Sequence, residues 1–205
     1  MVKNGLLKVI ITIVVLVVSV SAQDKSKDFL EMVQKKYNSI NDLSAEFKQL
    51  LNEKNNLIGK LYYARGNKLR LELKNSTVIS DGTVLWNYNK KQKKVVINNA
   101  SSSEPSYFSV DKFLNDYPSK STVSLEKEDD RNVLVLVPQK DSNLNFKKAK
   151  IWVKQDSLIE RVSIENLSGG IVNLQFSNYK LNQNLPDSMF TFSPPEGTNV
   201  IDLRK

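Results

Sequence analysis

A strict alternation of apolar and charged residues constrains the fold of this chain more than any other feature. Residues 68–74 read Lys-Leu-Arg-Leu-Glu-Leu-Lys, so leucines and charges take turns along the segment. Because successive side chains of a strand point to opposite faces, the leucines share one face and the charges the other. The segment is therefore predicted to be a strand in a sheet with one apolar face and one wet face.

The alternation extends over residues 43–97, and turn signals interrupt it at Asn55-Asn56, Gly66-Asn67 and Asp81-Gly82. After a serine-rich break at 101–106, further strands are expected at 122–126, 132–137, 147–154, 159–165 and 171–177. Turns are expected at Asp129-Asp130 and Gly169-Gly170. Short strands at regular spacing favour an antiparallel meander. Residues 185–205, which include three prolines, are expected to form a loop with one short strand.

Two helices are expected. Residues 26–40 carry apolar side chains three and four positions apart, with Ser26 as N-cap; the stripe comprises Phe29, Met32, Val33, Tyr37 and Ile40. A second helix is predicted over 109–116 and is ended by Pro118. A sheet with so few helices must bury its apolar face on a second sheet, by closing on itself, or by curling around the helices.

The N-terminus predicts export. Lys3 and Lys8 form a short positive region before an almost wholly apolar stretch at 9–18, and small residues follow up to Ala22. Residues 1–22 are therefore interpreted as a cleaved signal peptide, which leaves one domain over 23–205. The alternative is an uncleaved anchor, but the apolar stretch is short for a span of about 20 residues.

Composition narrows the chemistry. The chain has no cysteine and no histidine, so thiol nucleophiles, imidazole or thiolate metal sites and Ser-His-Asp triads are excluded. No cofactor or metal is expected. The formal net charge is +8, which suits nucleic acid, anionic lipid or an acidic partner. Export argues against nucleic acid.

Three motifs resemble the periplasmic outer-membrane lipoprotein carrier (LolA-type) family. They are the segment from Gly59 to Arg70, the hairpin Ser80-Asp-Gly-Thr-Val-Leu-Trp-Asn-Tyr-Asn, and the C-terminal Phe190-Thr-Phe-Ser-Pro-Pro-Glu-Gly197. Their order and spacing agree with the family from about residue 26 onward. The resemblance implies an α+β, mostly β fold: an incomplete antiparallel β-barrel covered on its concave face by helices.

The resemblance also implies a function without catalysis. Such a carrier holds lipoprotein acyl chains in a hydrophobic cavity and takes them from an inner-membrane ABC-type transporter to an outer-membrane acceptor. One buried CH₂ is worth about 0.8 kcal/mol, so a chain of about 16 carbons resists entering water by roughly 10 kcal/mol or more. A soluble shuttle is therefore needed in the periplasm.

Arg65 matches the arginine by which the family latches its covering helices through their backbone carbonyls. The family usually has proline after it, whereas this chain has Gly66. The candidate cavity wall comprises Phe47, Leu61, Leu69, Leu71, Leu73, Val78, Phe113 and Leu114. For all of these, ordinary core packing is the alternative. A basic cluster is formed by Lys90, Lys91, Lys93 and Lys94, and it is predicted to dock to an acidic partner or an anionic bilayer. The alternative is that these lysines are only the solvated end of a hairpin.

Trp86 and Tyr88 are interpreted as structural residues of the sheet. Two other function classes stay open. Paired carboxylates at Glu126, Glu128, Asp129 and Asp130 could support glycoside hydrolysis, although they sit beside a turn where no other group converges. A sensor or structural module could bind a lipidated protein in the same half-barrel without transporting it.

Overall fold

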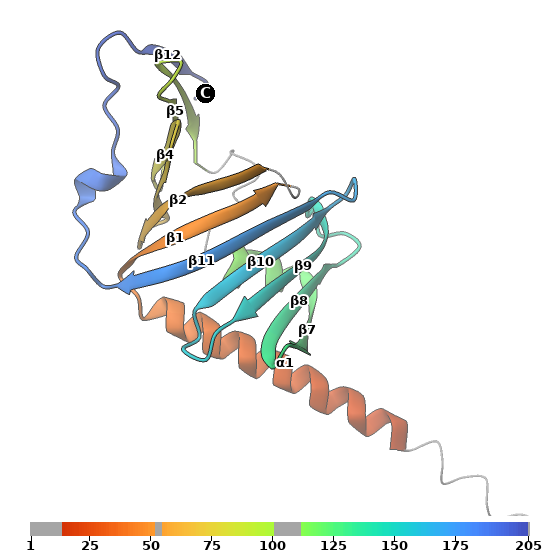
Figure 1. Cartoon of the computed structure of the whole chain (residues 1–205). Helices are drawn as coiled ribbons and strands as arrows, with labels where there is room; N and C mark the ends of the chain where they lie inside the picture. The colour runs from red at the N-terminus through yellow and green to blue at the C-terminus, as the bar shows by residue number, and fades with distance from the viewer. Residues whose placement is uncertain (1–13, 52–54, 101–111, 205) are drawn as a thin grey trace, which may run out of the picture.

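The computed structural model describes residues 14–51, 55–100 and 112–204, and places twelve strands of these residues in one sheet. The strand order is β12-β6-β5-β4-β3-β2-β1-β11-β10-β9-β8-β7 (Figure 1). The strands are β1 (Asp42–Leu51), β2 (Asn55–Ala64), β3 (Lys68–Leu73), β4 (Ser76–Asp81), β5 (Val84–Asn89), β6 (Lys94–Asn99), β7 (Ser121–Glu128), β8 (Arg131–Pro138), β9 (Phe146–Val153), β10 (Ile159–Asn166), β11 (Ile171–Leu181) and β12 (Asn199–Asp202). Neighbours are antiparallel except β12 and β6, which are parallel.

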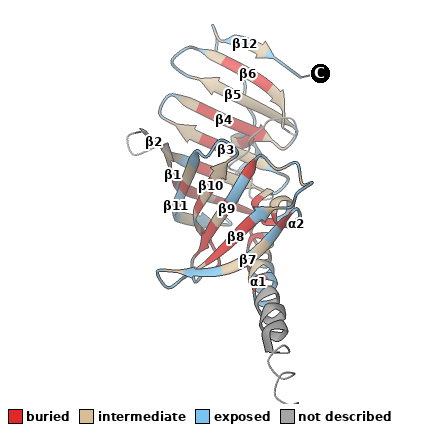
Figure 2. Ribbon diagram, turned by 90° about the vertical axis from the view of Figure 1, so that its right-hand side faces the viewer, coloured by how far each residue is buried: buried red, intermediate tan, exposed pale blue. Residues whose placement is uncertain are grey.

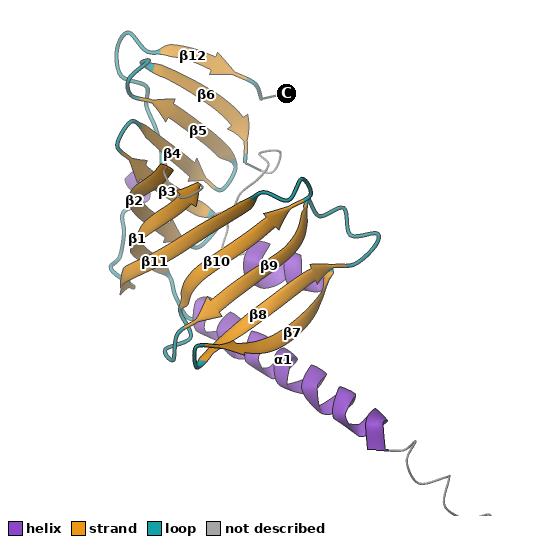
Figure 3. Ribbon diagram, turned by 45° about the vertical axis from the view of Figure 1, so that its right-hand side comes forward, coloured by secondary structure: helices purple, strands orange, loops and turns teal. Residues whose placement is uncertain are grey.

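The sheet is curved and does not close into a barrel. Strands β12 and β7 stand at its two ends, and each has one neighbour. Figure 1 shows the strands from β3 to β6 turned steeply away from those between β11 and β7, as the right-handed twist of a large sheet accumulates. The helices lie on one side, behind β8 to β10 in Figure 3. The expected mostly β, incomplete antiparallel barrel is confirmed.

The first helix, α1 (Val14–Asn38), starts earlier than predicted and runs through the expected cleavage site after Ala22. Ser26 is therefore inside the helix, and its Oγ donates to the Val123 carbonyl of β7 at 3.2 Å. The N-cap assignment was wrong because the helix does not begin there. No helix among the described residues is both long and apolar enough to cross a bilayer.

Most of the predicted apolar stripe is correct, although α1 ends at Asn38 and Ile40 lies beyond it. Val33, Tyr37 and Ile40 are buried in the main core, and Phe29 packs against it. Met32 is 44% exposed, so it was wrongly placed in the stripe.

Residues 109–111 of the predicted second helix lie outside the described residues, and the structure describes the rest from Lys112. A π-helical turn, η1 (Lys112–Asp116), leads into α2 (Tyr117–Ser119). Pro118 does not end the helix as expected but lies in the first turn of α2. Proline is tolerated there because its missing N–H would have no partner within the helix.

Most turn predictions agree with the backbone. Gly66, Gly82 and Gly169 have positive φ, as do Asp129 and Asp130. The prediction at Asn55-Asn56 was wrong. Both residues belong to β2, where they pair with Leu51 and Leu50 of β1.

The main core lies on the concave side of the sheet and follows the period of two, and a smaller buried group that includes Ile79 and Ile97 lies on the face of Arg70. In β10, Val162 and Ile164 are buried in the main core, whereas the alternating Arg161 and Ser163 are only partly buried. Figure 2 shows buried residues along the strands next to the helices and also along β4 and β6, which lie farther from the helices. The oily face is therefore turned inward.

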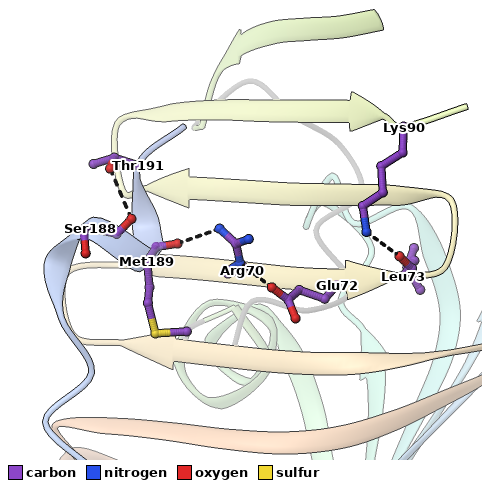
Figure 4. A network of polar contacts seen from close by, with 7 residues as sticks. All are labelled: Arg70, Glu72, Leu73, Lys90, Ser188, Met189 and Thr191. Atoms are coloured by element: carbon purple, nitrogen blue, oxygen red, sulfur yellow. Dashed lines mark hydrogen bonds and ion pairs between the residues drawn. The ribbon is translucent and has the colours of Figure 1, made fainter. Parts of the chain in front are cut away.

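The C-terminal segment crosses the opposite, convex face before it adds β12. It contains a 3₁₀ turn, η2 (Asp187–Phe190), in which Phe190 is buried. Arg70 Nη1 donates to the Met189 carbonyl at 3.2 Å (Figure 4), and the rings of Tyr88 and Phe192 are 5.1 Å apart. Because Arg70 points away from the concave Leu71, this segment covers the outer side of β3 to β5.

The buried carboxylate of Asp42 fixes where the C-terminal segment leaves the sheet. It accepts backbone N–H groups of Gln183, Asn184 and Leu185 at 2.8, 3.0 and 3.4 Å. Three N–H donors on one carboxylate set the direction of the chain where β11 ends.

Candidate functional site

All eight residues assigned to the cavity wall lie together on the concave side, in or against one apolar cluster. Leu61, Leu71 and Val78 are neighbours across β2, β3 and β4. Phe47, Leu61, Leu71, Phe113 and Leu114 are each no more than 4% exposed. Leu69, Leu73 and Val78 are only partly buried. The set therefore divides into packed core and partly open wall.

The strand register extends the open wall beyond the predicted residues. Leu69 faces Ser80, which faces Leu85 on β5. Val78 faces Asn87, which faces Val96 on β6. Both Leu85 and Val96 are partly buried. Neither residue was assigned to the cavity wall from the sequence. The alternation indicates which residues face inward, but it does not show which strands lie beside one another.

The described helices cover the other half of the concave face. α1 packs against β7 and η1, and α2 packs against β7 and β8. Figure 3 shows the strands from β3 to β6 rising away from this helical layer. The partly buried leucines and valines of β3 to β6 therefore lie next to the helices rather than beneath them.

Arg65 bonds to the end of α1, as the resemblance suggested. Its Nε donates to the Ile40 carbonyl at 3.1 Å, its Nη2 donates to the Asn38 carbonyl, and its backbone N–H donates to Asn41 at 3.0 Å. The last carbonyls of a helix lack partners within it and carry partial negative charge, which suits a guanidinium. The side chain is exposed and ties the β2–β3 turn to the junction between helix and sheet.

Gly66 explains how this turn departs from the family pattern. Its φ is +82°, and Asn67 follows with φ +58°. Proline is fixed near −65° and cannot adopt the backbone conformation seen at Gly66. The turn that presents Arg65 is therefore built differently from an Arg-Pro turn.

Gln34 makes a contact that the sequence did not reveal. Its Nε2 on α1 donates to the Leu114 carbonyl of η1 at 2.6 Å and to Asn115 Oδ1 at 3.4 Å. The bond joins the two helical segments that cover the core. No spacing rule marks it, because its partner is 80 residues away.

Tyr37 fixes α1 to the sheet, and Tyr179 bonds to the same residue of β10. The Ile159 N–H donates to the Tyr37 hydroxyl at 3.0 Å, and the Tyr179 hydroxyl donates to the Ile159 carbonyl at 2.8 Å. Burial raises the pKa of Tyr37 to about 12 and, with the neighbouring Tyr37, raises the pKa of Tyr179 well above its usual value. Both hydroxyls therefore stay protonated at neutral pH and keep these bonds.

The lysine cluster lies at the β5–β6 hairpin. Lys90, Lys91 and Lys93 are exposed, whereas Lys94 is partly buried in β6 beside β12. Lys90 Nζ donates to the Leu73 carbonyl at 2.9 Å (Figure 4). One lysine of the four thus supports the neighbouring turn.

Two of the four acidic residues considered for catalysis, Glu126 and Glu128, are paired with Lys150. Lys150 Nζ lies 2.5 Å from Glu128 and 3.7 Å from Glu126, and Trp152 Nε1 donates to Glu128 at 3.1 Å. The hydrogen bond from Lys150 lowers the pKa of Glu128, whereas a general acid needs a raised one. Across residues 14–51, 55–100 and 112–204, no three Asp, Glu, His or Cys side chains gather as a metal ion would need.

The described residues form a half-open antiparallel sheet with an apolar concave face and a partial helical cover. The chain belongs to the family described as "Outer membrane lipoprotein carrier protein LolA", whose sequence pattern matches residues 38–193. It is similar to an outer-membrane lipoprotein carrier protein of Legionella pneumophila, with 25% identity over 186 residues that cover 86% of this chain and 91% of the relative. The corresponding protein of Francisella tularensis subsp. novicida is 24% identical over 210 residues, covering 96% and 97% of the two chains.

A solved structure supports the fold. A DUF1329 family protein from Desulfovibrio piger superposes with a TM-score of 0.51 and 13% identity, covering 83% of this chain and 97% of that one. At this identity the likeness concerns the architecture alone.

Proposed function

We propose that this protein carries lipoproteins across the periplasm by holding their acyl chains against the concave wall of β3 to β6. The observation that carries the proposal is the partly buried row of aliphatic side chains beside the helices; it comprises Leu69, Leu73, Val78, Leu85 and Val96. An apolar surface that the protein's own side chains cover only in part is suited to a hydrocarbon guest.

The energetics fit a reversible carrier. Each CH₂ moved from water onto such a wall gains about 0.8 kcal/mol, so even part of one chain binds strongly. Because binding is strong, release of the acyl chain requires a movement of the helices that cover the concave face. The helical cover is joined to the rest of the protein by polar contacts that can be broken and remade singly.

Two of these contacts are assigned to opening. Arg65 latches the end of α1, and Gln34 joins α1 to η1. A buried bond, from the Ile159 N–H to the Tyr37 hydroxyl, holds α1 to the sheet. Opening therefore moves η1 and α2 with their apolar residues Phe113 and Leu114, and the Gln34 bond to Leu114 breaks.

The partners follow from this role. Acylated lipoproteins are the cargo, an inner-membrane ABC-type transporter supplies them, and an outer-membrane acceptor receives them. Residues 1–22 act as the export signal, and the exposed lysines of the β5–β6 hairpin dock to an acidic partner. Catalysis is not part of the function.

Transfer tests the proposal. Purified protein is added to inner-membrane vesicles that contain the releasing transporter and an acylated lipoprotein, with and without ATP. We expect ATP-dependent appearance of a soluble complex and delivery of its lipoprotein to outer-membrane vesicles. Binding without delivery would instead identify a sensor, and failure to bind the acylated form would contradict both.

A further inference from the structure

The turn between β10 and β11 carries no charge and has an exposed aliphatic residue at each end. Residues 167–171 read Leu-Ser-Gly-Gly-Ile, and Leu167 and Ile171 are 58% and 54% exposed. Figure 1 shows this turn at the right-hand tip of the sheet, where β10 ends and β11 begins. Two large apolar side chains therefore lie at an edge of the molecule.

The neighbouring strands continue this apolar surface. By the strand register, Ile58, Leu50 and Ile171 are diagonal neighbours on the convex face of β2, β1 and β11, opposite the core residue Phe47. Ile58 is exposed, and so is Leu57, which as the preceding residue of β2 points to the other face. This end of the sheet is therefore apolar on both faces. A protein partner that packs on one face would leave the other in water, whereas a bilayer surrounds both.

The backbone N–H groups of the β10–β11 turn are bonded within it. Ser168 and Gly170 donate to Asn166 Oδ1 at 3.1 and 2.8 Å, and Gly169 donates to the Asn166 carbonyl at 3.1 Å. The Ser168 hydroxyl also donates to Asn166 Oδ1, at 2.8 Å. An N–H group that enters an apolar medium without a partner is strongly unfavourable. A turn whose donors are satisfied leaves water at a much lower cost.

Lysines border the apolar end. Lys147 and Lys148 of β9 are exposed beside Glu165 of β10, which lies 3.9 Å from Lys147 and faces Lys148 across the two strands. On the other side of the surface, Lys48 of β1 is the cross-strand neighbour of Ile58. Lysines that surround an apolar surface attract anionic lipid headgroups, and their long side chains reach them from the side.

We propose that the β10–β11 turn, together with Leu57 and Ile58 of β2, docks the protein on the surface of an anionic bilayer. Leu167 and Ile171 insert among the headgroups, and the bordering lysines contact the lipid phosphates. Docking needs no cargo, so it goes beyond the proposed carrier function. Vesicle binding and lipoprotein transfer are measured separately, and failure of one leaves the other standing.

Site-specific fluorescence tests the docking. The chain has no cysteine, so Leu167→Cys takes a single nitrobenzoxadiazole label. Leu203→Cys is the matched control, since Leu203 is exposed to a similar degree beyond β12. When phosphatidylcholine vesicles that contain phosphatidylglycerol are added, we expect the emission at position 167 to rise and shift to shorter wavelength, and that at 203 to stay constant. Both proteins have the same N-terminal segment, so the difference reports on the turn. An unchanged signal at 167, or an equal rise at both positions, would overturn the docking.

Vesicle sedimentation measures which residues carry the binding. Leu167→Ser combined with Ile171→Thr should weaken binding to the same vesicles about tenfold, because less apolar area leaves water. Val200→Thr combined with Leu203→Ser removes two similarly exposed residues elsewhere and should bind like the wild type. Lys148→Gln should weaken binding about fivefold.

Two results would reassign the surface. Equal binding to vesicles with and without phosphatidylglycerol would overturn the anionic target. Self-association that Leu167→Ser with Ile171→Thr abolishes, in a protein that binds no vesicles, would assign the surface to a second copy of the chain and overturn the bilayer.

Discussion

Gly82 lies against Gly66 so closely that a Cβ atom added to Gly82 would stand 2.1 Å from the Gly66 carbonyl oxygen. The β4–β5 turn therefore supports the β2–β3 turn that presents Arg65. Gly82 also has φ +96°, which L side chains rarely adopt. Two separate constraints thus require glycine at this position.

Gly82→Ala should destabilise the protein by about 2 kcal/mol, because it combines an unfavourable φ with a backbone clash. Gly169→Ala is the matched control, since Gly169 has φ +88° and open space around its Cβ position. It should cost only about 1 kcal/mol. Urea unfolding of both variants measures the difference, and equal losses would show that the contact between the turns has no energetic weight.

Gln34→Leu should loosen the helical cover without unfolding the protein. Loss of the 2.6 Å bond to Leu114 removes about 1 kcal/mol of local stability, so amide exchange in η1 and α2 should rise about fivefold. Lys35→Leu, on the exposed side of the same helix, serves as the control. Unchanged exchange in Gln34→Leu would remove this residue from the opening step.

The Tyr37 bond predicts a loss of stability at high pH. The unfolded tyrosine titrates near 10 and the folded one near 12. Above pH 10 the unfolded state therefore binds fewer protons than the folded state, and the contribution of the protonated hydroxyl disappears progressively between pH 10 and 12. The limiting loss is roughly 3 kcal/mol. Unfolding free energies of wild type and Tyr37→Phe, measured across this range, should converge; parallel curves would contradict the assignment.

Substitutions of Leu71 and Leu73, both on β3, distinguish a residue of the packed core from a residue of the proposed ligand-binding wall. Leu71 is 3% exposed, so Leu71→Glu should prevent folding by burying a charge. Leu73 is partly buried, so Leu73→Glu should fold and lose most of its affinity for acyl chains. Circular dichroism checks folding and a fluorescent acyl probe checks binding. Full affinity in a folded Leu73→Glu protein would place the guest elsewhere.

The sheet was predictable because its determinants are local. The alternation at 68–74 and the glycine turns act within a few residues, and β3 and the turns at Gly66 and Gly82 appear where they were expected. Ser26 shows the limit of local reasoning. Serine is a good N-cap only if the helix begins there, and the upstream apolar residues instead continue the helix.

The contacts that position the cover were not predictable, because they join distant residues. The bond between Gln34 and Leu114 spans 80 residues, and the bonds from Asp42 to the C-terminal segment span more than that. Polar residues on a helix or at a strand end carry no mark of such partners. Arg65 was found only because its surrounding motif resembles the family.

Native mass spectrometry of the protein purified from its own host tests the central claim most directly. If the concave wall of β3 to β6 holds acyl chains, a fraction of the molecules should carry the added mass of one acylated protein or of fatty acid. Leu73→Glu should lose that mass while it remains folded. A wild-type protein that is always free of acyl ligand, and that takes up none when an acylated lipoprotein is supplied with its releasing transporter, would contradict the account.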